Sequence, residues 1–561
     1  IGDGKDAGTG IYVGNNGTSG TPNPSKVTVT GTTINLNGSN GVGAIVTTDS
    51  TVNIDGTTTI NFEGDGVGVY GQKGAHVTNS AVLNTKGHSV ERTRVTEGSS
   101  IIAANLTGAA AADSGNIISH VINGETVVNP GITVEAKSGT QNIIGLMADG
   151  IKNPSPTHTS WKGDVNYEAI NDGKIDLSNA TTSTAMYLDS SRGINKDEIA
   201  VGNKSTGIYG VYNDTTSIYS DAVAGTKNEG KIMTTAGSKI TIGDESSAIY
   251  AIDFDKVENN GSITGGDKSV GIYAKNTTGL STAKNIDVTN TGNIILGKGS
   301  AGIYIAPETT NNPNATVVNS GNITVGDSIL NASGVATSTS VGIYATNKTN
   351  LTTTGNITVG NKGFALYGNN SNLTVNGGNY NFANNGSLAY LENGSVLNYN
   401  NTGTLTTSSE PMLYIIDSKA NMNNNDIVVS ANGTGVYMTG NSTFSGWNNM
   451  TLNSGSTGIY VENSKATIDG KNITGTANKA KGIVAINSDV TNKANMQFSD
   501  DDSIGIFSRN NSGSAKNIVN TGNIDITGER SIAAYLEGTS DQTFENSGTI
   551  NVDKTTISLL F

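Results

Sequence analysis

Two short motifs carry residue types and spacings that could do catalytic or cofactor chemistry. Ser281 and Lys284 have the spacing of a serine nucleophile and its lysine base, but the companion motifs of that enzyme class are missing. Gly66, Gly68 and Gly71 spell a dinucleotide-binding fingerprint, which needs a helix N-terminus to hold the pyrophosphate. We expect a strand instead of a helix at these glycines, and a loop between repeats at Ser281 and Lys284, so neither motif predicts a catalytic or cofactor-binding residue.

Metal-binding chemistry has equally little support. Asp500, Asp501 and Asp502 could hold calcium with their oxygens, although a solvated acidic corner explains the run more simply. The four histidines do not have the spacing of metal ligands; they are His76, His88, His120 and His158. The chain has no cysteine, which removes thiolate sites and disulfides. We therefore predict no metal, no cofactor and no catalytic residue.

Trp161 is the candidate partner-binding residue. It follows a proline-containing stretch within residues 75–187, a region that also holds all four histidines and the basic run Glu91-Arg92-Thr93-Arg94. One interpretation is a recognition loop with an aromatic anchor. The alternative is an exposed insertion whose tryptophan simply packs against its surroundings.

The elements that would position such residues follow from a repeat. An aromatic slot recurs every 23 or 24 residues, at Tyr344, Tyr367, Tyr390, Tyr414, Tyr437 and Tyr460 and then at Val484 and Phe507. A fixed period of this size is typical of repeat architectures. Earlier in the chain we place the slot at 12, 45, 70, about 102, 147, 187, 209, 250, 273 and 304.

Each repeat predicts three strands and two corners. The slot is often written Gly-Ile-Tyr, and a turn-forming residue follows three positions after it, at Asn15, Asp253, Asn276, Asn347, Asn370, Asn393, Asp417, Asn463, Asn487 and Asn510. Asn and Asp tolerate left-handed backbone angles, so they predict a sharp corner. A second signature, such as NTGNIILG at 290–297, predicts a corner at its glycine with positive φ and then a strand.

Alternation within the first strand assigns its two faces. The residues directly before and after the slot are apolar, for example Ile343 and Ala345, and should be buried. The tyrosine between them should face outward and stack on its equivalents in adjacent turns. Such a stripe could bind sugar rings or a protein partner, or it could be a purely structural ladder.

Stacked repeats of this kind predict an all-β fold, a parallel β-helix (β-solenoid) of roughly twenty coils with loop insertions. Residues 1–186 should form a less regular part and residues 187–561 a regular part. The period lengthens near residues 75–187, 210–248 and 305–341, where we expect insertions on the surface.

Composition limits the partners. The formal net charge of −14 argues against nucleic acid, which needs clustered Lys and Arg. No segment is apolar enough for a membrane helix, so we predict no membrane insertion by this chain. Its first and last residues suggest a fragment of a longer protein.

The alternation of GIYA strands at 271–274 and 342–345 with corners at 290–297 and 353–360 resembles the passenger domains of type Va autotransporters. The asparagine-rich style is similar to the large outer-membrane adhesins of fusobacteria, most clearly over residues 187–561. This resemblance implies a right-handed β-helix at the bacterial cell surface, on the extracellular side of the outer membrane. It also implies a monomeric adhesin passenger without its membrane barrel, a virulence factor that acts in coaggregation with partner bacteria or binds host glycans or receptor proteins.

Two alternatives stay open. The chain could be a passive stalk that displays a binding region outside this sequence. It could also be a polysaccharide-acting β-helix enzyme, which would need paired acids. Residues 345–484 carry mainly Asn, Thr and Gly where such acids would stand, so we predict no enzyme activity.

Overall fold

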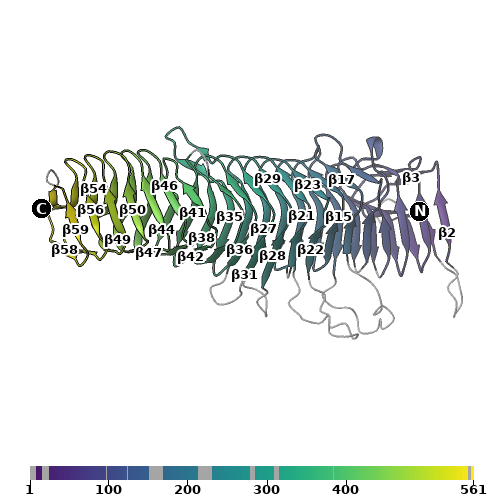
Figure 1. The fold of residues 1–561 in the computed structure, drawn as a ribbon. Helices are drawn as coiled ribbons and strands as arrows, with labels where there is room; N and C mark the ends of the chain where they lie inside the picture. Colours follow the sequence, from purple (N-terminus) through teal and green to yellow (C-terminus); the bar gives the residue numbers. More distant parts are fainter. Residues whose placement is uncertain are drawn as a thin grey trace, which may run out of the picture. The chain divides into compact units, whose positions relative to one another are not determined.

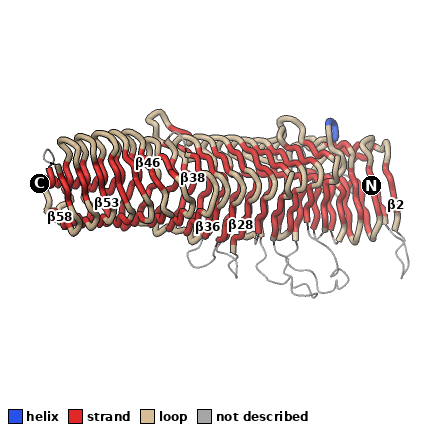
Figure 2. Tube along the Cα trace, viewed as in Figure 1, coloured by secondary structure: helices blue, strands red, loops and turns tan. Residues whose placement is uncertain are grey.

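The chain folds into an all-β parallel β-helix of about 19 turns, which confirms the predicted fold class (Figure 1). The computed structural model describes residues 8–14, 24–96, 98–122, 124–150, 168–212, 230–254, 256–277, 285–308, 315–382, 385–553 and the backbone of 557–560. Within these residues the only helical element is the 3-10 turn Gly108–Ala110, drawn blue in Figure 2.

The strands form two compact units, which are described separately. Unit 1 comprises Ile1–Leu296 and Ala306–Pro313, and unit 2 comprises Gly297–Ile305 and Asn314–Phe561. The predicted division into a less regular part and a regular part at residue 187 is a different distinction and stays a prediction.

A typical turn contains three strands, here called A, B and C, separated by corners 1, 2 and 3. In unit 1 one such turn consists of β18 (Thr184–Asp189), β19 (Arg192–Asn195) and β20 (Glu198–Val201). In unit 2 an equivalent turn consists of β35 (Val341–Thr346), β36 (Asn350–Thr353) and β37 (Ile357–Val359). The predicted three strands per repeat are therefore confirmed.

Strand A carries the aromatic slot in both units. Its copies in unit 1 are β1 (Thr9–Val13), β4 (Gly41–Thr47), β7 (Gly66–Gln72), β10 (Val90–Thr96), β12 (Ile117–Ile122), β15 (Ile144–Asp149), β18, β21 (Thr206–Val211), β24 (Ser247–Ile252) and β27 (Val270–Asn276). In unit 2 they include β35, β38 (Phe364–Asn369), β41 (Ser387–Glu392), β44 (Leu413–Ile416), β47 (Thr434–Ser445), β49 (Thr457–Asp469), β51 (Lys481–Ile486), β54 (Ile504–Asn510), β57 (Ile532–Gly538) and β60 (Ile557–Leu560). Strands β47 and β49 continue through corner 1 into strand B.

Parallel pairing in register brings equivalent residues together within each unit. Tyr187 pairs with Tyr209 and Tyr209 with Tyr250, and in unit 2 Tyr344 pairs with Tyr367. The flanking residues are buried as predicted, since all of those named here have 0% exposure; they are Ile208, Ile303, Ile343, Leu366, Leu413, Val436 and Ile459 before the slot and Ile305, Ala345, Leu391, Ile415, Met438 and Val461 after it.

Corner 1 is confirmed at most of its predicted asparagines and aspartates. The residues with left-handed φ, between 47° and 56°, are Asp253, Asn347, Asn370, Asn393, Asp417, Asn463 and Asn487. The prediction is wrong for Asn276 and Asn510, which are the last residues of β27 and β54. Both are buried and bond to backbone instead: Asn276 Oδ1 accepts from Glu308 N–H at 3.0 Å, and Asn510 Nδ2 donates to Ser514 O at 2.8 Å. Asn15 lies outside the described residues.

The predicted positive φ at the corner 2 glycines is wrong. Gly292, Gly355 and Gly522 do not adopt left-handed backbone. A Cβ on Gly292 would lie 1.7 Å from the carbonyl oxygen of Gly261, and one on Gly355 would lie 2.0 Å from that of Gly321. Glycine is therefore required because the backbones of neighbouring turns approach closely at this corner.

The same argument explains the glycine of Gly-Ile-Tyr. A Cβ on Gly207 would lie 2.6 Å from the carbonyl oxygen of Ala248, and one on Gly342 would lie 2.5 Å from that of Ala365. In each case the acceptor belongs to strand A of the next turn. The left-handed residue of corner 3 is often a lysine, with φ of 55° at Lys204 and 53° at Lys268.

A ladder of buried asparagines fills the interior at corner 2. Asn259 is fully buried; its Nδ2 donates to Asn290 Oδ1 at 2.7 Å and to Gly261 O at 3.2 Å, and its Oδ1 accepts from Thr234 Oγ1 at 2.6 Å. Unit 2 has an equivalent ladder in which Asn492 Nδ2 donates to Asn520 Oδ1 at 2.7 Å. These amides satisfy backbone carbonyls that no strand partner reaches.

The period predicted a large insertion within residues 75–187, and this prediction is wrong. Most of the described residues of this region build complete turns. Arg94 pairs with Tyr70 on one side and with His120 on the other, and His120 pairs with Met147. The slot predicted near residue 102 therefore lies at residues 94 and 120. The period was not recognised here because these two slots hold Arg and His instead of an aromatic residue.

Candidate functional site

The predicted partner-binding residue, Trp161, lies outside the described residues together with the rest of 151–167. Residues 213–229 and 309–314, in two other predicted insertions, also lie outside them. Within residues 305–341, β31 (Ala315–Asn319) and β32 (Ile323–Val325) are strands of an ordinary turn of unit 2. The insertion itself is an antiparallel hairpin of β33 (Ile329–Leu330) and β34 (Ala336–Ser338). At its tip Val335 is 61% exposed, and Lys362 Nζ donates to Gly334 O at 3.0 Å.

The basic run Glu91-Arg92-Thr93-Arg94 is part of strand β10 instead of a recognition loop. Arg92 is buried, and its guanidinium donates to Ala81 O at 2.5 Å and to Ala110 O at 2.8 Å. Burial lowers the pKa of Arg92 to about 10, partly offset by Asp113. Arg92 therefore has a structural role, whereas Glu91 and Arg94 face outward.

The main candidate surface is the outward face of strand A, called here the tyrosine face. In unit 1 the rings of Tyr187, Tyr209, Tyr250 and Tyr273 stack with centroid distances of 5.1, 5.5 and 4.5 Å. In unit 2 the stack runs from Tyr304 through Tyr344, Tyr367 and Tyr390 with distances of 4.4, 4.3 and 5.1 Å. The predicted outward file of tyrosines is confirmed.

The geometry of the stack decides which part of each ring a partner can reach. Tyr304 and Tyr344 are inclined by only 6°, and Tyr367 and Tyr390 by 8°. Near-parallel rings cover each other's faces, so the ring edges and hydroxyl groups point outward. The tyrosine face is therefore less suited to stacking a sugar ring than to hydrogen bonding along its edge.

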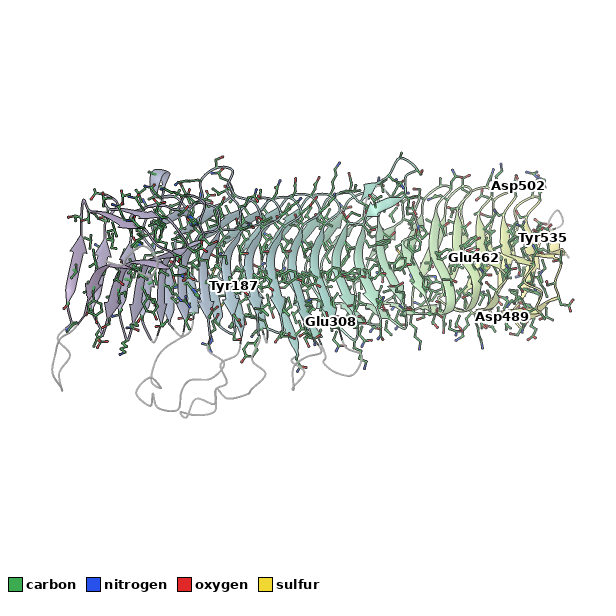
Figure 3. The ribbon with its side chains drawn as sticks, turned by 180° about the vertical axis from the view of Figure 1, so that it is seen from behind. Tyr187, Glu308, Glu462, Asp489, Asp502 and Tyr535 are labelled. Carbon is green, nitrogen blue, oxygen red and sulfur yellow. The ribbon has the colours of Figure 1, made fainter. Side chains whose placement is uncertain are left out.

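Carboxylates accompany the tyrosine hydroxyls in unit 2. Tyr367 donates to Glu392 Oε1 at 2.6 Å, and Tyr437 donates to Glu462 Oε2 at 2.9 Å. Tyr535 donates to Glu537 Oε2 at 2.9 Å. Glu462 and Tyr535 are labelled in Figure 3. Pairs of phenol and carboxylate therefore occur on several turns of this face in unit 2.

We expect the ladder tyrosines to resist ionisation. Burial raises the pKa of Tyr187 to about 12, with further contributions from Tyr209 and the nearby aspartates. Burial and the Glu462 hydrogen bond raise the pKa of Tyr437 to about 12. These folded-state pKa values exceed the ordinary value near 10. The contribution of the un-ionised tyrosines to the free energy of unfolding is therefore complete below about pH 10 and is lost as pH rises towards 12.

The measurement is a spectrophotometric titration of phenolate absorbance on native and urea-unfolded protein. At about pH 11 most tyrosines of the unfolded chain should be ionised, whereas the ladder tyrosines of the native protein should not. Coincident titration curves would contradict the prediction.

A second cluster of chemically active side chains lies on the same face in unit 1. His120 is almost fully buried; its Nδ1 lies 3.2 Å from Glu91 Oε2 and its Nε2 lies 2.9 Å from Asp149 Oδ2. Since both acceptors are carboxylates, both ring nitrogens donate and the imidazole is a cation. Burial alone would lower the pKa of His120, but the bonds to Asp149 and Glu91 raise it to about 9.

This raised pKa predicts a pH-dependent contribution to stability. The stabilisation from the His120 cation is fully present below about pH 6.5 and is lost as pH rises through 9. His120→Gln should lower the free energy of unfolding by on the order of 2 kcal/mol at pH 6. The difference between the wild type and this variant should shrink towards pH 9.5 in urea titrations, and a pH-independent difference would contradict the assignment.

The other motifs have structural roles where they are described. Gly66, Gly68 and Gly71 lie in strand β7, and no helix begins there. Asp502 is at a corner, on the upper edge in Figure 3, and binds Arg530 with Nε and Oδ1 2.7 Å apart. Ser281 and Lys284 lie outside the described residues.

Metal and membrane sites can be tested for the described part of the chain. Within it no three His, Cys, Asp or Glu side chains are grouped closely enough to hold a metal ion. No helix in the same residues is long and apolar enough to cross a membrane.

Comparison with known proteins does not assign the chain to a family. No protein-family model matches the chain, and no curated protein matches its sequence.

Sequence reasoning missed the grouping of Glu91, Arg94, His120 and Asp149. Arg94 follows Tyr70 by 24 residues and His120 follows Arg94 by 26, close to the repeat period. Searching that spacing for any residue type, instead of for aromatic residues, would have found both slots.

Proposed function

We propose that this β-helix is part of a non-enzymatic bacterial surface adhesin, the passenger of a type Va autotransporter. It would attach the cell to partner bacteria or to host glycans or receptor proteins. The observation that supports this proposal best is the tyrosine face, where hydroxyl groups recur and several of them are paired with carboxylates. A repetitive polar surface with aromatic bodies is suited to many weak contacts that add up along one partner.

The passive stalk is the second candidate function, and the ring stacking favours it. Rings that cover each other's faces stabilise the β-helix without any ligand. In this alternative the tyrosine face is a structural ladder and attachment depends on other parts of the protein.

One experiment separates the two proposals. The purified chain should bind epithelial cells or partner bacteria and block attachment of the bacterium that produces it. A Tyr344→Phe, Tyr367→Phe and Tyr437→Phe variant keeps the ring stack but removes three hydroxyl groups. For an adhesin that uses this face, the variant should fold normally but block attachment less well.

Failure of the wild-type chain to bind or block would support the stalk instead. Trp161→Ala tests the predicted aromatic anchor in the same assay, and unchanged binding would reject it. A reducing-end assay on a polysaccharide panel tests the non-enzymatic assignment, since released ends would contradict it.

A further inference from the structure

The tyrosine face of unit 1 contains a non-aromatic interruption. Between Tyr70 and Tyr187 the successive slots hold Arg94, His120 and Met147, each paired in register with the next turn. Figure 3 labels Tyr187, where the regular ladder of unit 1 begins. The interruption therefore replaces ring stacking on three consecutive turns by groups of other chemistry.

His120 fixes the arrangement of this interruption. Its side chain is 7% exposed and lies between Glu91 on β10 and Asp149 on β15. Both ring nitrogens are used by these carboxylates, so His120 offers no donor to a ligand. Its role is to hold the two carboxylates in place.

Two polar atoms on the strands beside His120 have no hydrogen-bond partner among the described residues. Arg94 makes no hydrogen bond to a described residue; its Nε is buried and lies 3.8 Å from Glu91 Oε2, too far for one. Asp149 Oδ2 binds His120, but Asp149 Oδ1 is buried without a partner. The Arg94 and Asp149 side chains as a whole are 38% and 26% exposed, so a group from outside can reach other atoms of the cluster beside these two buried ones. An unpaired donor and an unpaired acceptor on the two strands that flank β12 are groups that a ligand or water would satisfy.

The charges and donors of the cluster define the ligand class. Arg94 and His120 carry two positive charges and Glu91 and Asp149 two negative charges, so the sum is zero and a neutral ligand is favoured. The ligand must accept from the guanidinium and donate to a carboxylate of the same cluster. Neighbouring hydroxyls of a sugar do both, and the half-exposed Met147 beside them can contact its apolar CH face.

We propose that Glu91, Arg94, His120 and Asp149 form a binding site for a neutral saccharide on the tyrosine face of unit 1. Arg94 donates to a sugar oxygen, Asp149 and Glu91 accept from hydroxyl groups, and His120 positions both carboxylates. This proposal rests on the proposed adhesin function and specifies its partner as a neutral glycan. Its occupant lies along strands β10, β12 and β15, so a short oligosaccharide could span it.

Calorimetric titration of the intact chain with maltotetraose, cellotetraose and lacto-N-tetraose tests the proposal. We expect at least one of them to bind. Arg94→Met keeps the aliphatic stem but removes the donors, and should weaken that binding by about ten-fold or more because hydrogen bonds to charged groups are lost. Arg192→Met is the matched control, since Arg192 Nε is also buried without a partner but lies on strand B; it should change affinity less than about two-fold.

Three results would overturn the site: none of the tetrasaccharides binds, Arg94→Met binds as the wild type does, or Arg192→Met loses as much affinity. Unchanged thermal unfolding of Arg94→Met excludes misfolding as the cause of a loss. The adhesion assay reads the proposed function independently. Blocking of attachment without saccharide binding rejects this site alone, and Arg94-dependent saccharide binding without blocking supports the site and rejects the adhesin.

Discussion

Gly292→Ala is expected to destabilise unit 1 by more than about 3 kcal/mol, among the largest effects of any single methyl group in the chain. The new Cβ would lie 1.7 Å from Gly261 O and 2.8 Å from Gly261 C, closer than non-bonded atoms can stand. The obstacle is backbone, so no side-chain rotation relieves it. Asn259 Nδ2 donates a hydrogen bond of 3.2 Å to the same Gly261 carbonyl, so this carbonyl cannot move away from the new Cβ without breaking that bond.

Gly56→Ala is the matched control, because the atom nearest to its new Cβ is Ser80 O at an ordinary 3.7 Å. This change should alter stability by less than about 1 kcal/mol. Urea unfolding followed by circular dichroism measures both variants, and hydrogen exchange shows which turns open. Equal stability of the two variants would disprove the steric role of Gly292.

Asn259→Ala should cost about 3 kcal/mol or more, the second of the large effects. The substitution removes a fully buried amide and leaves Asn290 Oδ1, Gly261 O and Thr234 Oγ1 each without one partner. Each of these groups then keeps its desolvation cost without the compensating bond. Because a turn contacts mainly its neighbours, we expect protection from hydrogen exchange to fall most near β25 (Lys256–Asn259) and β28 (Ile286–Asn290).

Asn61→Ala provides the comparison on the surface of the same unit. Asn61 also links adjacent turns, donating to Asn35 Oδ1 at 2.7 Å and accepting from Asn84 Nδ2 at 2.7 Å, but it is only partly buried and these bonds are open to water. Water replaces its bonds, so the loss should stay below about 1 kcal/mol. If the two asparagine variants had the same urea midpoint, burial would not be what makes the corner 2 ladder important.

The repeat period was sufficient to predict which residues of strand A are buried. Alternating side chains and a fixed repeat length place Ile343 and Ala345 inside and Tyr344 outside, whatever the detailed corner geometry. The same logic failed in residues 75–187, because Arg94 and His120 occupy slots that were expected to be aromatic. A search for recurring aromatic residues therefore misses turns whose slot holds another residue type, although the slot itself still recurs at the repeat spacing.

Close contacts between turns could not be inferred from local propensity. Gly292 looked like a turn glycine, since glycine supplies positive φ at low cost. Its actual constraint is the carbonyl of Gly261, which is 31 residues earlier in the chain. Asn276 and Asn510 likewise resembled corner residues, but their amides bond to the Glu308 N–H and the Asp541 carbonyl, which only the folded chain brings near.

The sequence by itself determined that this protein is a stack of three-stranded turns with an outward column of tyrosines, because both features depend only on repeat length and alternation. The tertiary structure decided which polar residues meet. Glu91, His120 and Asp149 are separated by 29 residues at each step, yet register pairing of β10, β12 and β15 places them within hydrogen-bond distance. Contacts of this kind depend on the register between turns, which one-dimensional spacing of mixed residue types does not encode.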